Sequence, residues 1–161
     1  MLKNEKEVPA VLHLKSSRLR ILFPLLTVLW FAFILARSLK NGVQSDSESG
    51  LVRSFLQGLF PGITMHFVRK LAHFLEYFLL GGLLLTDFRL YGRRSLFRPA
   101  LLGLLAAGTD ELVQRFVPQR SGELLDVLLD FSGVLTGILT ALGLWALAEK
   151  RKRGKEGKRR D

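Results

Sequence analysis

The sequence predicts an all-α protein, an integral membrane four-helix bundle. Two observations lead to this class. The mean hydropathy is positive, +0.24, although 24% of the residues are charged, so charged and apolar residues are segregated along the chain. Four apolar stretches approach the roughly 20 residues that a spanning helix needs, and four of them leave a soluble protein too little polar surface. We expect spans at residues 19–36, 67–86, 99–117 and 124–148.

The first stretch, residues 19–36, carries no charge after Arg20. A cleaved signal peptide is the alternative interpretation. However, the apolar run exceeds the usual signal core of roughly 7–15 residues, and Ile34 stands where a small residue is expected before a cleavage site. We therefore expect an uncleaved span, preceded by a basic N-terminal segment at residues 1–18.

The connection after this stretch begins with a polar loop at residues 45–50 and then turns apolar. Its apolar residues recur on one face of a helix that Pro61 and Gly62 end. This pattern predicts a short amphipathic helix, either lying in the outer membrane interface or packed on the bundle as a lid. The apolar residues are Leu51, Val52, Phe55, Leu56, Leu59 and Phe60.

Lysine and arginine residues predict the orientation of the spans. Most of the 24 lie in three segments that four spans would place on one side: residues 1–18, the connection around residues 89–98, and the tail at residues 149–161. We therefore expect both termini in the cytoplasm, a membrane domain at residues 19–148, and a disordered low-complexity tail from Lys150. The net charge of +10 is then mainly a topology signal that also suits anionic lipid, and we expect no nucleic-acid partner.

The polar residues inside the spans are the informative ones, because charges in a membrane segment are costly. At 100° per residue they occupy about a third of the circumference of the second span, about 100° of the third and one narrow stripe of the fourth. They come early in the second and fourth stretches, which enter the membrane from outside, and late in the third, which leaves toward the outside. All three sets therefore fall in the outer half of the membrane. This predicts a polar cavity near the extracytoplasmic surface, to which the connection before the fourth span adds Arg120. The candidates are Lys70, His73, Glu76, Tyr77, Asp110, Glu111, Gln114, Arg120, Asp126 and Asp130.

A purely structural interpretation stays open, in which Lys70, Arg115 and Arg120 pair with the carboxylates to hold the bundle together. Because the candidate carboxylates outnumber these cations, we favour a binding or reactive site. The first stretch carries no such polar residue, and we expect it to serve as an anchor and packing wall. Gly133 and Gly137 form a GxxxG pattern, which favours close helix packing rather than chemistry.

At these positions the sequence resembles the VanZ-like family of small polytopic bacterial membrane proteins, named for a teicoplanin-resistance determinant. The resemblance covers roughly residues 21–147. It implies a multi-pass protein of the bacterial cytoplasmic membrane, linked to the cell envelope and to lowered susceptibility to lipoglycopeptides, but it supplies no reaction. The matching segments are residues 70–77 (KLAHFLEY), 111–114 (ELVQ), 118–120 (PQR) and 126–133 (DVLLDFSG).

This chain departs from the family pattern at Asp130, where the pattern has Asn. An Asn donates a hydrogen bond and an ionised Asp does not. Two interpretations of Asp130 therefore remain: either it is protonated or it faces a cation.

Three functions fit these observations. The first is a membrane protein that binds or modulates an envelope lipid, a lipid-linked cell-wall intermediate or a lipoglycopeptide, with Arg120 and Lys70 meeting anionic groups. The second is a small intramembrane enzyme acting on a lipid head group, with His73 and Glu76 or Glu111 as acid and base. The third is a proton-coupled transporter, which four spans without an inverted repeat would build only as a dimer.

No cofactor is expected. A metal-dependent version of the enzyme would use His66, His73 and a carboxylate, but two helical turns separate these histidines, so the sequence predicts no metal ligand. Homo-oligomerisation stays open.

Overall fold

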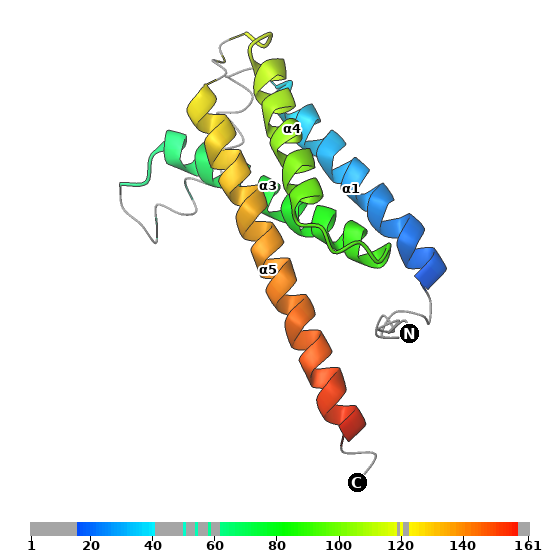
Figure 1. The fold of residues 1–161 in the computed structure, drawn as a ribbon. Coiled ribbons are helices and arrows are strands. Elements are labelled where there is room, and N and C mark those ends of the chain that lie inside the picture. Colours follow the sequence, from blue (N-terminus) through cyan, green and yellow to red (C-terminus); the bar gives the residue numbers. More distant parts are fainter. Residues whose placement is uncertain are drawn as a thin grey trace.

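The computed structural model describes residues 16–40, 50, 54, 58, 62–118, 120 and 123–157. Within them the fold is all-α, as predicted, with four long helices (Figure 1). The apolar residues of the amphipathic helix expected at residues 51–60 lie outside the described part of the chain, as do residues 1–15 of the basic N-terminal segment. The helices are α1 (Ser16–Ser38), α3 (Met65–Leu90), α4 (Phe97–Gln114) and α5 (Leu124–Gly157).

The helix ends follow from local chemistry. The Thr64 hydroxyl caps α3 by accepting a hydrogen bond from the Phe67 backbone N–H at 3.2 Å. Helix α4 ends at Gln114, three residues before the predicted limit of 117, because the chain turns there ahead of Pro118. The expectation of a disordered tail from Lys150 is wrong up to Gly157. The run of alanine, leucine and long charged residues after Gly143 has high helix propensity and continues α5.

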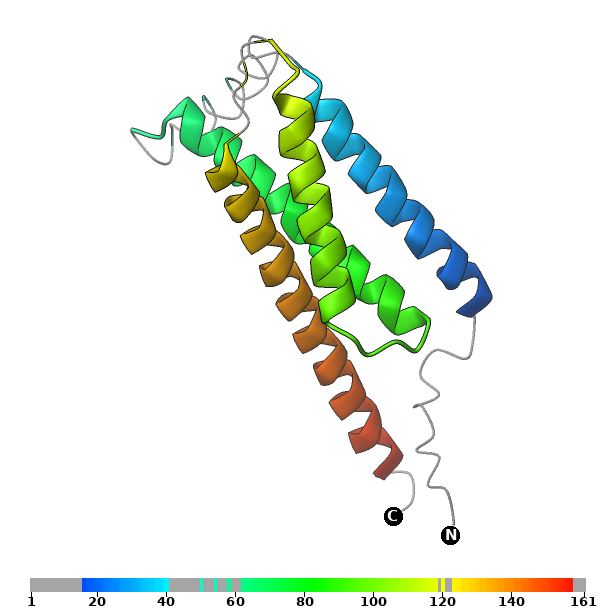
Figure 2. The ribbon, with the colours of Figure 1, turned by 45° about the horizontal axis from the view of Figure 1, so that its top comes forward.

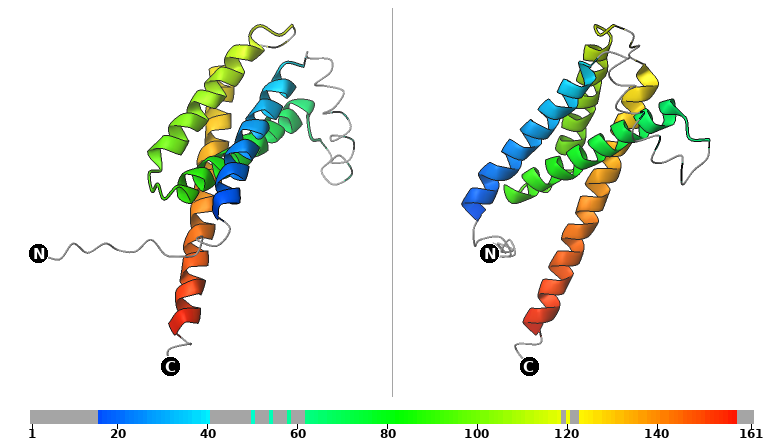
Figure 3. Two further views of the ribbon diagram at one scale, coloured as in Figure 1. Left: turned by 90° about the vertical axis from the view of Figure 1, so that its right-hand side faces the viewer. Right: turned by 180° about the vertical axis from the view of Figure 1, so that it is seen from behind.

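The helices alternate in direction (Figures 1 and 2). The start of α1, the connection between α3 and α4 and the end of α5 lie at one end of the bundle. The end of α1, the start of α3, the end of α4 and the start of α5 lie at the other, which we call the pocket end. Helix α3 is tilted against its neighbours, and α5 projects beyond them (Figure 3).

Helices α3 and α5 cross so closely that their backbones are in contact. A Cβ added at Gly137 would overlap the Phe78 carbonyl, and one added at Gly81 would overlap the backbone of Val134. The structure therefore bears out the packing role predicted for the GxxxG pattern of α5, and Gly81 of α3 packs in the same way. Around this crossing lies the apolar core: Ile34, Tyr77, Leu80, Leu84, Leu85, Ala107, Val134 and Ile138.

Three of the described helices are long and apolar enough to cross a membrane, in the ranges Arg18–Ser38, Met65–Leu90 and Leu124–Arg153. Helix α4 has only 18 residues and includes three charged ones, Arg98, Asp110 and Glu111. Large apolar side chains cover the outside of all four helices, among them Val28, Leu79, Leu105 and Leu139. Such a surface is typical of helices solvated by lipid.

Candidate functional site

A polar cavity of about 90 Å³ lies at the pocket end of the bundle. Its walls come from the first turns of α3, the last turns of α4, the loop before α5 and the first turns of α5. Polar and charged residues from these segments, with one leucine, line the cavity: His66, Arg69, Lys70, His73, Glu111, Gln114, Arg120, Glu123, Asp126, Leu129 and Asp130. We call this cavity the polar pocket.

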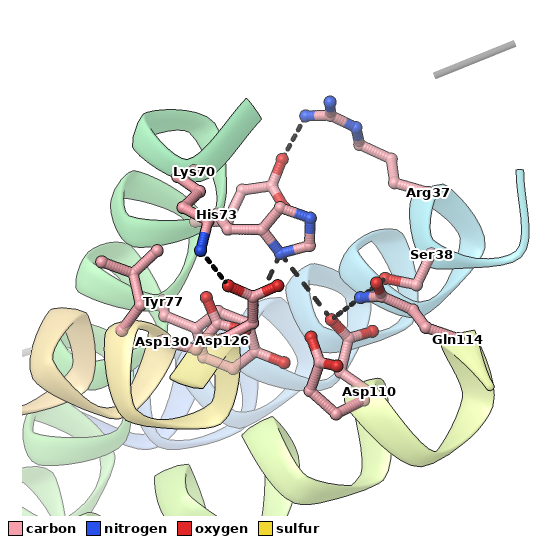
Figure 4. A network of polar contacts seen from close by, with 12 residues as sticks. Arg37, Ser38, Lys70, His73, Tyr77, Asp110, Gln114, Asp126 and Asp130 are labelled. Atoms are coloured by element: carbon pink, nitrogen blue, oxygen red, sulfur yellow. Dashed lines mark hydrogen bonds and ion pairs between the residues drawn. The ribbon is translucent and has the colours of Figure 1, made fainter. Parts of the chain in front are cut away.

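One wall of the polar pocket is an ion pair between α3 and α5. The Lys70 Nζ lies 2.6 Å from Asp126 Oδ1 (Figure 4), and the two side chains are 30% and 28% exposed. Because the pair is in contact with solvent, it neutralises charge at the rim of the pocket more than it stabilises the bundle.

His73 lies deeper, between carboxylates of two other helices (Figure 4). Its Nδ1 is 3.7 Å from Asp130 Oδ2 on α5 and 3.9 Å from Asp110 Oδ2 on α4. Both aspartates are fully buried. The Gln114 Nε2 donates to Asp110 Oδ2 at 3.1 Å and to the Ser38 hydroxyl at 3.5 Å, which fixes the Asp110 carboxylate relative to α1.

Glu76 lies on the side of α3 that faces α1, where it pairs with Arg37. Trp30 also binds this turn, because its Nε1 donates to the Glu76 carbonyl at 2.9 Å. The first helix, expected to be an anchor and packing wall, therefore also forms polar contacts with α3. Arg37 and Ser38 lie just beyond the predicted end of that span at residue 36, and for that reason the sequence interpretation missed them.

Two other predicted residues have well-defined partners. The Tyr77 hydroxyl, fully buried, donates to the Ala106 carbonyl at 3.3 Å and so joins α3 to α4. The Glu111 Oε2 accepts a hydrogen bond from the Glu123 backbone N–H at 2.9 Å. Glu111 therefore holds the start of α5 against the end of α4.

Arg120 comes from the loop between α4 and α5 and is half-buried. Burial is the main cause that lowers the pKa of its guanidinium, and the nearby charge of Arg69 acts in the same direction. An arginine still remains protonated. The lining of the pocket therefore includes three basic residues, Arg69, Lys70 and Arg120, of which Lys70 is paired with Asp126.

The structure brings seven of the ten predicted residues into the lining of the pocket: Lys70, His73, Glu111, Gln114, Arg120, Asp126 and Asp130. Asp110 lies behind His73, Glu76 faces α1, and Tyr77 is packed in the core. Arg115, a cation of the structural interpretation, is exposed. Besides Arg37 and Ser38, the sequence interpretation missed Arg69 and Glu123, which line the pocket. They stand among many charged residues near helix ends, and no pattern distinguishes them.

Together, these helices and the charged cluster between them define an all-α, multi-pass membrane protein with a polar pocket at one end of an apolar bundle. Residues 23–146 match the model of the VanZ/LLP1 family, so the chain belongs to this family and the resemblance seen in the sequence is confirmed. None of the curated proteins and none of the solved structures matches the chain.

Proposed function

We propose that this VanZ-family protein binds the anionic group of an envelope lipid, a lipid-linked cell-wall intermediate or a lipoglycopeptide in the polar pocket. One observation carries the proposal: Arg69, Lys70 and Arg120 line a cavity that also offers carboxylates, at the end of a bundle whose outside is apolar. Guanidinium and ammonium groups bind phosphate or carboxylate. The carboxylates would accept hydrogen bonds from sugar or peptide donors.

The proposal includes an orientation. All four helices span the bacterial cytoplasmic membrane, α4 as the shortest, and the pocket end faces outward. The basic residues after Leu90 and the basic end of α5 then lie in the cytoplasm, as the excess of lysine and arginine there favours. In this orientation the pocket is within reach of head groups in the outer leaflet. A role in teicoplanin-type resistance follows if the bound group is the antibiotic or its cell-wall target.

The test is direct binding to the purified full-length protein in nanodiscs of neutral phosphatidylcholine. The probes are a fluorescent polyprenyl-diphosphate saccharide and fluorescent teicoplanin. We expect Arg120→Ala and Lys70→Ala each to weaken binding of one probe at least tenfold, which corresponds to about 1.4 kcal/mol. Arg115→Ala is the matched control, because it removes an exposed arginine from the same end of α4. Unchanged affinity for both probes in both pocket variants would contradict the proposal.

A second function, an intramembrane enzyme acting on a lipid head group, is supported by the joint presence of His73 and Glu111 in the pocket. Of the two acids considered from the sequence, Glu111 is the better candidate, because Glu76 is paired with Arg37 and does not line the cavity. Turnover of membrane lipids by the wild type, abolished in the double variant His73→Ala, Glu111→Gln, would support the enzyme. Undiminished cellular function of that double variant would exclude it.

A further inference from the structure

Three side chains from three helices converge at the pocket, where His73 and Asp130 belong to the lining and Asp110 lies behind His73. His73 of α3, Asp110 of α4 and Asp130 of α5 each place one potential ligand atom within 4.8 Å of the other two (Figure 4). The 3.7 and 3.9 Å separations from His73 Nδ1 are too long for hydrogen bonds. A protonated His73 would form ion pairs with both aspartates at these distances, but without hydrogen bonds to hold the carboxylates.

The two aspartates have oxygens that lack hydrogen-bond donors. Asp130 is fully buried, and neither of its carboxylate oxygens has a hydrogen-bond partner among the described residues. Within the same part of the chain, Asp110 Oδ1 also has none, while Asp110 Oδ2 is bound by Gln114. Burying an ionised carboxylate without donors or a countercharge is strongly unfavourable. Arg37 pairs with Glu76 and Lys70 with Asp126, while a protonated His73 would be shared by both aspartates and would neutralise one of their two charges.

We propose that His73, Asp110 and Asp130 bind a divalent transition-metal ion. One imidazole nitrogen and two carboxylate oxygens are a donor set that Zn²⁺ and Mn²⁺ accept. Ligand atoms about 2.0–2.2 Å from a tetrahedral Zn²⁺ lie about 3.3 Å from one another. The two separations from His73 Nδ1 exceed this by about half an ångström, and the ligand atoms of Asp110 and Asp130 lie within 4.8 Å of each other. Side-chain rotations would bring the three donors onto the ion.

The surroundings of the three ligands suit an ion. The amide of Gln114 holds Asp110 from behind, as groups next to metal ligands commonly do. His73 and Asp130 line the pocket, so an ion bound to them has an open position toward it. Water or an anionic group in the pocket completes the coordination. Metal binding at these three residues does not depend on lipid or antibiotic binding.

The test measures metal binding by the purified full-length protein in nanodiscs, without lipid-linked or antibiotic ligands. The protein is stripped with a chelator and titrated with Zn²⁺ and, separately, with Mn²⁺. We expect about one ion per chain, bound more tightly than about 10 µM, and a higher thermal midpoint with the preferred ion. Asp130→Asn and Asp110→Asn should each weaken binding at least tenfold.

Asp87→Asn is the matched control. Asp87 is a partly buried carboxylate on α3 at the opposite end of the bundle, where its Oδ2 accepts from Thr27 at 2.7 Å. This variant should bind the ion like the wild type. A wild type that binds neither ion at one per chain overturns the proposal. Equal affinity in Asp130→Asn, or equal loss in Asp87→Asn, also overturns it.

A further measurement guards against variants that fail to fold. Co²⁺ loaded into the wild-type protein should give visible absorption bands of a site with nitrogen and oxygen ligands, and Zn²⁺ should displace it. In addition, the chelator should lower the thermal midpoint of the wild type, because it removes the ion that neutralises the buried carboxylates. It should not lower the thermal midpoint of Asp130→Asn, because this variant lacks one of those carboxylates. No Co²⁺ bands, or no effect of the chelator on the wild type, counts against the site. Failure here leaves the proposed ligand binding by Arg120 and Lys70 standing, since that is measured separately.

Discussion

Arg37 at the end of α1 forms an ion pair with Glu76 in the interior of α3. The two partners differ in environment, because the Arg37 side chain is 34% exposed and that of Glu76 only 9%. The pair joins the first helix to the polar cluster, which the sequence alone assigned to the other three. Because the environments of the two partners differ, removing Arg37 and removing the charge of Glu76 should lower the stability by different amounts.

We expect Arg37→Ala to destabilise the protein more than Glu76→Gln does. Removing Arg37 leaves a buried carboxylate without its cation, and such losses reach about 3–5 kcal/mol for fully buried pairs. Removing the charge of Glu76 leaves an arginine that solvent can reach. Thermal unfolding in detergent compares the two variants, and the double variant should match Glu76→Gln. Equal destabilisation by both single variants would contradict this account.

The crossing of α3 and α5 gives a second prediction. Gly137→Leu should destabilise the bundle, because even a Cβ at this position overlaps the Phe78 carbonyl and the helices must move apart. The expected cost is at least the roughly 1–3 kcal/mol typical of overpacked sites. Gly143→Leu is the control on the same helix, where nothing lies within 4 Å of an added Cβ. Similar unfolding midpoints for Gly137→Leu and Gly143→Leu would contradict the prediction.

The Lys70–Asp126 pair should contribute little to stability. Both side chains are about a third exposed, so solvent screens their attraction. We expect Lys70→Met to change the free energy of unfolding by less than about 1 kcal/mol, and about 0.5 M salt to shrink the difference further. A large loss of stability would mean that the effect of Lys70 variants on ligand binding comes from unfolding rather than from the pocket.

The orientation can be tested with single cysteines, since the chain has none of its own. Pro118→Cys lies at the pocket end of the bundle and Ser95→Cys in the connection between α3 and α4. In intact cells, a membrane-impermeant maleimide should label Pro118→Cys, while Ser95→Cys should react only after the membrane is opened. The opposite pattern would place the pocket in the cytoplasm and overturn the outer-leaflet proposal.

The helices and the gathering of polar residues at one end could be predicted because both follow from one-dimensional patterns. Apolar length predicts the helices, and the alternation of early and late charges predicts which end of the bundle they share. The pairing within the cluster could not be predicted, since it depends on how each helix is rotated about its axis. The Gly81 and Gly137 contacts set the rotation of α3 relative to α5, and Glu76 therefore faces α1 rather than the pocket.

The uninterrupted course of α5 has a mechanical consequence. Asp130 and Lys150 belong to one continuous helix and, at 1.5 Å per residue, lie about 30 Å apart along its axis. A helix transmits twist and axial displacement along its length, so the two residues move as parts of a single rod. Any contact that fixes the basic end of α5 therefore also restricts the rotation of α5 about its axis, and with it the direction in which Asp126 and Asp130 point toward the other helices.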